Sequence, residues 1–198
     1  MVEKSFPLSG YASLDIVGNP TTLTYSIHLS KKPYAQEPVV AALSLEEWKY
    51  LTTLLPAIRT SAQEIWEEVQ AGRTPKLTQV QRVLSDSFLL RLNAYTAPNG
   101  NVYVTTGIRR YFTIAEGEMV LKKEGGVTLS YEELVNLVNK MDEINDYLSY
   151  LHSNHKHVAI NGFEDVMTAQ QFIQNFWKMG HGKCRLVLEK PASQTDGA

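Results

Sequence analysis

Apolar residues recur at two different spacings along the chain, and the change of spacing marks the expected elements. Residues 5–43 hold short runs rich in Tyr, Leu, Ile, Val and Thr, which turn residues separate. Such runs are typical of strands joined by turns. From Ser44 onward, apolar residues recur every three or four positions as far as Val69, which predicts an amphipathic helix that ends near Gly72. Ser44 and Glu47 have the spacing of a capping box, which supports a helix start at this point.

The same order of elements is expected a second time. A second amphipathic helix begins after Ser130, with Glu133 at the capping-box spacing, and it aligns with the first helix at a constant offset of 86 residues. Any two amphipathic helices can be aligned in this way, but the shared capping box and the preceding block of strands favour a true repeat. We therefore expect an α+β protein with two β-β-β-β-α repeats. Its second set of strands is expected at residues 87–94, 101–106, 108–115 and 117–121, with a hairpin turn at 97–100.

The expected organisation follows from these repeats. A divergent first β4α repeat covers residues 1–71, a connector residues 72–85, and the second repeat residues 86–152. Residues 153–190 are expected to form a small strand-helix-strand extension, and residues 191–198 a disordered tail.

Composition limits the class of protein. Of 198 residues, 43% are hydrophobic and 20% charged, which is an ordinary globular composition and excludes a collagen-like or disordered chain. Cys184 is the single cysteine, so a disulfide within the chain is impossible and a reducing compartment is favoured. No apolar run approaches the roughly 20 residues of a membrane helix, and no signal-peptide core is present. We expect an intracellular protein that does not associate with membranes.

The net charge of −2 conceals a segregation of charge within the second repeat. Residues 88–123 carry five basic and two acidic residues, whereas residues 128–152 carry one basic and five acidic residues. The basic segment also contains Tyr103, Tyr111 and Phe112. Cations that follow phosphates and rings that stack on bases are what a single-strand binder needs. The alternative interpretation is an ordinary solvated face of the strands.

One stretch of the second repeat resembles a known family. Residues 108–119 read IRRYFTIAEGEM and are followed by LKKEGGVTLSYEE. This resembles the signature of the positive cofactor 4 family of single-stranded-DNA-binding transcriptional coactivators, with a close match over about residues 101–150. The resemblance implies a curved four-stranded sheet followed by a helix, dimerisation through the helices and DNA binding on the sheets. Two such units in one chain also resemble the Whirly family, in which tandem repeats build a pseudo-dimer. The residues in register are Ile108, Arg109, Tyr111, Glu116, Gly117, Glu118, Met119, Gly126 and Leu129.

The resemblance also implies site residues. Arg109 falls on a DNA-contacting arginine of the family, Phe112 on a stacking tryptophan, and Lys122 or Lys123 on a basic residue after the turn. The family's aromatic-basic pair in the preceding hairpin has no clean counterpart, because Gly100 and Asn101 stand there. The full set of expected DNA-binding residues is Arg109, Arg110, Phe112, Tyr103, Lys122, Lys123, Arg91, Lys31 and Lys32.

We therefore expect a protein that binds single-stranded DNA largely without sequence preference, without catalysis and without a cofactor. It would act where DNA is, in transcription, replication or recombination, with proteins of those processes as further partners. No nucleophile elbow, P-loop or zinc-protease motif is present in the sequence. The alternative is a structural or protein-interaction protein that keeps the fold without DNA binding. A duplex or RNA binder is a second alternative.

Two further expectations concern metals and assembly. His152, His155, His157, His181 and Cys184 have spacings that could suit zinc, but we expect no metal site, because such spacings are common without one. The apolar stripes of the two helices are expected to face each other. Chains are expected to associate through the helices as a homo-oligomer, as a dimer rather than a tetramer.

Overall fold

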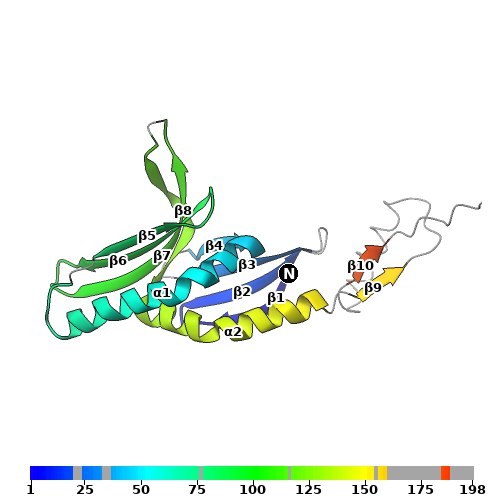
Figure 1. Cartoon of the computed structure of the whole chain (residues 1–198), viewed down its shortest axis with the longest axis horizontal. Coiled ribbons are helices and arrows are strands. Elements are labelled where there is room, and N and C mark those ends of the chain that lie inside the picture. The colour runs from blue at the N-terminus through cyan, green and yellow to red at the C-terminus, as the bar shows by residue number, and fades with distance from the viewer. Residues whose placement is uncertain are drawn as a thin grey trace, which may run out of the picture. The chain divides into compact units, whose positions relative to one another are not determined.

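The computed structural model describes residues 1–19, 24–32, 37–75, 78–115, 117–153, 156–159 and 184–187. The chain divides into two compact units. One comprises Met1–Gly18 with Tyr25–Ile144, and the other Asn19–Thr24 with Asn145–Ala198. The first unit contains two four-stranded sheets (Figure 1).

The first sheet contains β1 (Val2–Pro7), β2 (Ala12–Asn19), β3 (Thr24–Lys31) and β4 (Val39–Ser44), in chain order. Its strands alternate between a buried apolar face and a polar face, as strands with one covered face must. The strands expected within residues 5–43 are confirmed. The apolar face consists of Phe6, Leu14, Ile16, Ile27, Leu29 and Leu43, and the polar face carries Ser5, Ser13, Asp15, Ser26, His28 and Ser30.

Helix α1 (Leu45–Gln70) follows β4 directly. The Ser44 hydroxyl accepts a hydrogen bond from the Glu47 amide, and the Glu47 carboxylate accepts one from the Ser44 amide, which confirms the predicted capping box. The helix ends at Gln70 with Ala71 as its C-cap, and Gly72 follows with a φ of 68°, a conformation that favours glycine. The buried stripe is Trp48, Leu51, Leu55, Ile58, Ala62 and Ile65.

The second sheet contains β5 (Gln79–Val83), β6 (Phe88–Thr96), β7 (Val102–Thr113) and β8 (Met119–Ser130), again in chain order. The second repeat therefore has four strands, but three of the expected boundaries are wrong. The connector expected at residues 72–85 contains β5, the runs at 101–106 and 108–115 form one strand, and the strand expected at 117–121 continues to Ser130 as β8.

The glycines that suggested breaks lie within these strands. Gly107 continues β7 without interruption, and Gly125 and Gly126 continue β8 as far as Ser130. Gly107 and Gly126 are buried in the sheet beside the Arg109 side chain. They provide room for a side chain rather than a turn.

Helix α2 (Tyr131–Ser153) completes the second repeat. Ser130 and Glu133 form the predicted capping box, because the Ser130 amide donates to the Glu133 carboxylate and the Glu133 amide to the Ser130 hydroxyl. The protein is thus an α+β fold with two β4α repeats.

Each helix covers the sheet of the other repeat rather than its own. Helix α1 lies against β6 and β7, and α2 runs beside the first sheet (Figure 1). The Asn136 amide of α2 donates to the Leu8 carbonyl at 2.8 Å, and Lys4 of β1 pairs with Glu143 at 3.0 Å. The expectation that the apolar stripes face each other is therefore wrong, because each stripe is buried on a sheet.

The direct contacts between the helices are of a different kind. Arg59 Nη1 of α1 donates to Asn139 Oδ1 of α2 at 3.1 Å. Near the end of α1, Trp66 stacks on Tyr131, with ring centroids 5.1 Å apart. These contacts use the sides of the helices that the sheets do not cover. Association of chains through the helices stays a prediction.

The same contact stabilises both exchanged helices: a serine hydroxyl in a turn of one repeat donates to the capping-box glutamate of the other. We call this contact the anchor. In the β1–β2 turn, the Ser9 hydroxyl donates to Glu133 at 2.8 Å, and in the β5–β6 turn, the Ser85 hydroxyl donates to Glu47 at 2.6 Å. Both serine hydroxyls also accept two backbone amides of their own turns. Each capping-box glutamate therefore joins its helix to a turn of the opposite repeat.

The two anchors differ in one residue. Lys31 Nζ of β3 lies 2.6 Å from the Glu133 carboxylate and also donates to the Thr128 carbonyl. Glu133 is only 4% exposed. Burial raises its pKa, but hydrogen bonds from Lys31, the Ser130 amide and Ser9 outweigh burial, so that the pKa of Glu133 lies below its ordinary value.

In the second unit, β9 (Lys156–Ala159) and β10 (Cys184–Val187) form a parallel pair. They coincide with the two strands expected in the extension. The expected helix of that extension and the tail at 191–198 lie outside the described residues, as do His155 and His181. Among the described helices, none is long and apolar enough to cross a membrane.

We predict that Glu133→Gln lowers the free energy of unfolding by about 2 kcal/mol at pH 7, because Lys31 would remain half-buried without its partner. A lowered carboxylate pKa stabilises the fold above the ordinary value of 4.5, and this contribution disappears as the pH falls through the folded-state pKa. The difference between variant and wild type should therefore shrink between pH 7 and pH 3 in urea titrations. A difference independent of pH would contradict this account.

Glu47→Gln is the matched control. It changes the corresponding capping box and the hydrogen bond from Ser85. It should cost about 1 kcal/mol at pH 7, the usual effect of a weakened helix cap. A loss equal to that of Glu133→Gln would show that Lys31 contributes nothing.

Candidate nucleic-acid interface

The face of the second sheet that points away from α1 carries a row of basic and aromatic side chains. Pairing of β6 with β7 sets the two faces, since Leu90 stands opposite Ile108 and Leu92 opposite Thr106. These four residues are buried beneath α1. Side chains alternate along a strand, so the neighbouring positions point the other way. We call this opposite face the basic-aromatic face, and it comprises Leu89, Arg91, Asn93 and Tyr95 of β6 and Tyr103, Thr105, Gly107 and Arg109 of β7, of which Leu89 is buried.

Arg91 is held across the strands by two neighbours. Its Nε donates to Asn93 Oδ1 at 2.8 Å, and its Nη2 donates to Gln79 Oε1 at 3.2 Å. The residue opposite Arg91 on β7 is Gly107, which has no side chain to cover it. The guanidinium is therefore oriented before any ligand arrives, which lowers the entropy lost on binding.

Arg109 lies in a channel between two glycines. A Cβ on Gly107 would come within 3.3 Å of Arg109 Cγ, and one on Gly126 within 3.0 Å of Arg109 Cδ. At the far end of the side chain, Nη2 donates to the Lys122 carbonyl at 3.1 Å. The arginine stem therefore rests on bare backbone, and its position depends on both glycines.

Two tyrosines form the aromatic end of the face. Tyr95 and Tyr103 stand opposite each other, and their rings stack with centroids 5.6 Å apart. Their side chains are prominent, with 52% of Tyr95 and 42% of Tyr103 exposed. Sequence reasoning missed Tyr95. Its signal lay in the hairpin turn at 97–100, because antiparallel pairing about that turn places Tyr95 opposite Tyr103.

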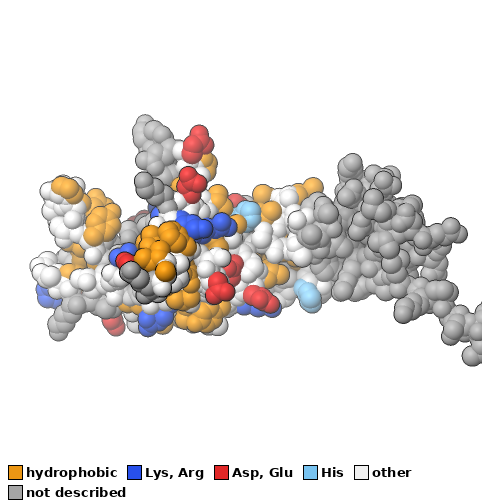
Figure 2. All heavy atoms as spheres, turned by 90° about the horizontal axis from the view of Figure 1, so that it is seen from above, with side chains coloured by type: hydrophobic (Ala, Val, Ile, Leu, Met, Phe, Trp, Pro, Cys, Tyr) orange, Lys and Arg blue, Asp and Glu red, His pale blue; other side chains and the backbone are white. Residues whose placement is uncertain are grey.

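Three other predicted residues gather at the base of the β7–β8 hairpin. Arg110, Phe112 and Lys122 line one hollow of about 720 Å³ with Leu121, Glu124 and Gly125. The Arg110 guanidinium lies 5.4 Å from the centroid of the Phe88 ring, and Phe112 is 44% exposed. The register of β8 shifts here between Arg109 and Tyr111. Figure 2 shows hydrophobic side chains on this projecting hairpin with Lys and Arg side chains beside them.

The remaining predicted residues are not brought to either place. Lys31 is engaged with Glu133 on the helix-covered side of the first sheet. Lys32 is exposed, and its amide donates to the Tyr11 carbonyl at the edge of the first sheet. The side chain of Lys123 lies outside the described residues. The structure therefore divides the predicted set into a sheet group, a hairpin group and two isolated lysines.

Charge on the basic-aromatic face is mainly positive. The positions of β5, β6 and β7 on this face, with Gly126, Thr128 and Ser130 of β8, hold two arginines and no Asp or Glu, whereas Glu124 lies exposed on β8 two residues before Gly126. An anion on this face would meet preoriented guanidinium groups. In the described part of the chain, no group of three or more His, Cys, Asp or Glu side chains could hold a metal ion. The arrangement can bind anions and planar rings.

No protein-family model matches this chain, and a search of curated proteins likewise finds no match.

We predict that Gly126→Ala destabilises the protein and disturbs Arg109. Its Cβ would lie 2.8 Å from the Ile108 carbonyl oxygen and 3.0 Å from Arg109 Cα, both of which are backbone atoms that cannot move aside cheaply. We expect a loss of about 1–3 kcal/mol in urea unfolding, the usual cost of overpacking. Gly10→Ala is the control, since nothing lies within 4 Å of its Cβ. Equal stability of the two variants would contradict the proposed channel.

Proposed function

We propose that the protein binds single-stranded DNA on the basic-aromatic face, largely without sequence preference. The observation that carries this proposal is the shared orientation of Arg91 and Arg109 with the stacked pair Tyr95 and Tyr103 on the uncovered face of one sheet. Guanidinium groups follow a phosphate backbone, and exposed rings stack on bases of any identity. The family resemblance at residues 108–119 points to the same class of ligand.

Single strands are favoured over duplexes by the geometry of the rings. A tyrosine can stack on a base only when that base is free of its own neighbours, and in a duplex the stack is already complete. Arg91, Arg109, Tyr103 and Tyr95 follow the strands of a sheet rather than a protruding helix that could enter a major groove. Single-stranded RNA also has a phosphate backbone and unstacked bases, so the affinity for RNA must be compared with the affinity for single-stranded DNA.

The first repeat is proposed to support this face rather than to bind. The corresponding polar face of its sheet carries serines with Asp15 and His28, and no Lys or Arg occurs among its described positions. Lys31 is engaged in the anchor with Glu133 instead. Binding would therefore be asymmetric, with one sheet for DNA and one for holding α2. Such a protein could serve transcription, replication or recombination.

A second candidate is a protein-interaction role, which one observation favours. Phe112 and Ile114 of the β7–β8 hairpin are large apolar side chains, both exposed and two residues apart, and Met119 is exposed opposite Thr113. Exposed apolar clusters commonly mark contact surfaces. The expected homo-oligomer would also use this hairpin, because the helix stripes are buried. Light scattering of wild type and of Ile114→Ser tests association through this hairpin. We expect an oligomer for wild type and a monomer for the variant.

We predict that Arg109→Ala and Tyr103→Ala each weaken binding of an oligothymidylate without unfolding the protein. Loss of stacking should cost about 1–3 kcal/mol per base. Arg109→Ala should also reduce the slope of log affinity against log salt by about 0.7 for each phosphate that the arginine neutralises in the wild type. Electrophoretic shifts and fluorescence anisotropy with single strands, duplex and RNA measure these effects.

The control is Arg59→Ala, which removes one arginine from α1 on the covered side of the sheet. It should leave affinity and salt slope nearly unchanged. Phe112→Ala tests the hairpin separately, and we expect weaker binding there too. Wild-type affinity in all of the Arg109, Tyr103 and Phe112 variants, with intact folding, would overturn the DNA-binding assignment and favour the interaction protein.

A further inference from the structure

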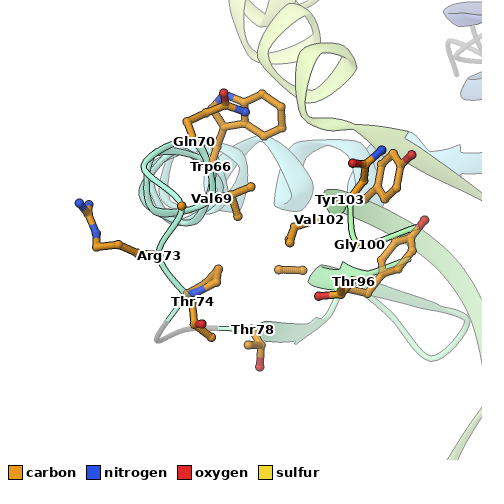
Figure 3. A pocket seen from close by; sticks show the side chains of 15 residues that line it. Trp66, Val69, Gln70, Arg73, Thr74, Thr78, Thr96, Gly100, Val102 and Tyr103 are labelled. Carbon is orange, nitrogen blue, oxygen red and sulfur yellow. The ribbon is translucent and has the colours of Figure 1, made fainter. Parts of the chain in front are cut away.

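A cavity opens between the end of α1 and the end of the β6–β7 hairpin, next to the basic-aromatic face (Figure 3). Its volume is about 690 Å³, within the range of sites that hold small molecules. Its walls come from three segments: Trp66, Val69 and Gln70 of α1, residues 72–75 with Thr78, and the ends of β6 and β7.

The walls of the cavity are fixed by hydrogen bonds. The Gly72 amide donates to the Val69 carbonyl and the Arg73 amide to the Glu68 carbonyl, which closes the end of α1. The Ala94 amide donates to the Thr78 carbonyl, which fastens the following segment to β6. Trp66 is held by its stack on Tyr131. The cavity is therefore formed before a ligand arrives.

The lining suits a flat ligand that is apolar on its faces and polar at its edges. Val69 and Val102 approach the cavity from the helix and from the sheet (Figure 3). Gln70, Thr78 and Thr96 add an amide and two hydroxyls, and within the described part of the chain no hydrogen bond occupies these side chains. Nucleobases have this character, with stacking faces and hydrogen-bonding edges.

Charge decides how such a ligand would be oriented. Arg73 is the one cation among the described lining residues, but its side chain points away from the cavity (Figure 3), and no Asp or Glu is among these lining residues. The end of α1 carries the partial negative charge of a helix C-terminus, which disfavours an anion deep in the cavity. A phosphate would therefore stay outside the cavity while a neutral base enters. Tyr95 and Tyr103 line the rim, so the cavity is continuous with the basic-aromatic face.

We propose that this cavity is a nucleotide site that takes one unpaired base and leaves the phosphate outside, on the side of the basic-aromatic face. Where the nucleotide is the end of a bound strand, the inference rests on the proposed function. Where it is a free mononucleotide, it does not. In the first case, a strand that crosses Arg109 and Arg91 passes the tyrosines and turns its terminal base into the cavity.

The test titrates the full chain with thymidine and adenosine 5′-monophosphates and follows Trp66 and Val102 by NMR. We expect saturable shifts in wild type and in Arg109→Ala, and their loss in Val69→Phe, which fills the cavity. Val69→Thr, of nearly the same size, is the control and should retain the shifts. Absence of shifts at Trp66 and Val102 with either nucleotide would overturn the inference.

A second arm separates the two sources of the nucleotide. An oligothymidylate with an abasic residue at one end should bind wild type at least about fivefold more weakly than the intact strand, the smallest effect expected for one stacked base. Val69→Phe should remove that difference while retaining binding through Arg109. If the intact strand and the strand with an abasic end bind wild type with equal affinity, while the mononucleotides still cause shifts, the cavity is a site for free nucleotides.

The same data distinguish failure of the two proposals. Mononucleotide shifts without oligonucleotide binding would overturn the proposed function and keep the cavity site. Oligonucleotide binding that depends on Arg109, without shifts at Trp66, would keep the proposed function and overturn the cavity site.

Discussion

The fold depends on a carboxylate at the start of each helix, buried in α2 and half-buried in α1, that is shared between two repeats. Glu133 caps α2, accepts from Ser9 of the first repeat and is neutralised by Lys31. Glu47 caps α1 and accepts from Ser85 of the second repeat. A helix start needs acceptors for its free amides, and a turn needs partners for its own polar groups. One glutamate meets both needs, and in doing so fixes which sheet its helix covers.

The two sheets share a topology, but they differ in the face that carries their basic residues. The first sheet directs Lys4 and Lys31 toward α2, where they pair with Glu143 and with the buried Glu133. The second sheet keeps Arg91 and Arg109 outward, supported by Asn93, Gln79 and bare glycine backbone. Two sheets of the same topology thus serve different roles, and the difference lies in which face receives the cation.

Local sequence patterns predicted the helices and most strands well, but they predicted contacts between distant segments less well. Both capping boxes and both helices followed from spacing, since caps and periodicity act over a few residues. The count of four strands in the second repeat agrees only because the missed β5 offsets the division of β7 into two expected strands. Strand β5 was missed because Gln79, Gln81 and Arg82 give it little apolar alternation. The strand ends expected at residues 106 and 121 were wrong, because β7 continues through Gly107 and β8 through Gly126. The exchange of helices and the Tyr95–Tyr103 pair depend on contacts between distant segments that periodicity does not encode.

The exchange of helices also constrains the order in which the chain can be completed during synthesis. Asn136 meets Leu8 across 128 positions, and Ser9 meets Glu133 across 124. The first sheet cannot cover its apolar face until α2 has left the ribosome, even though its own strands emerge first. Until then Leu14, Ile16, Ile27 and Leu29 lack the helix that buries them. The nascent first repeat is therefore a natural substrate for chaperones, and its folding is delayed until the second repeat arrives.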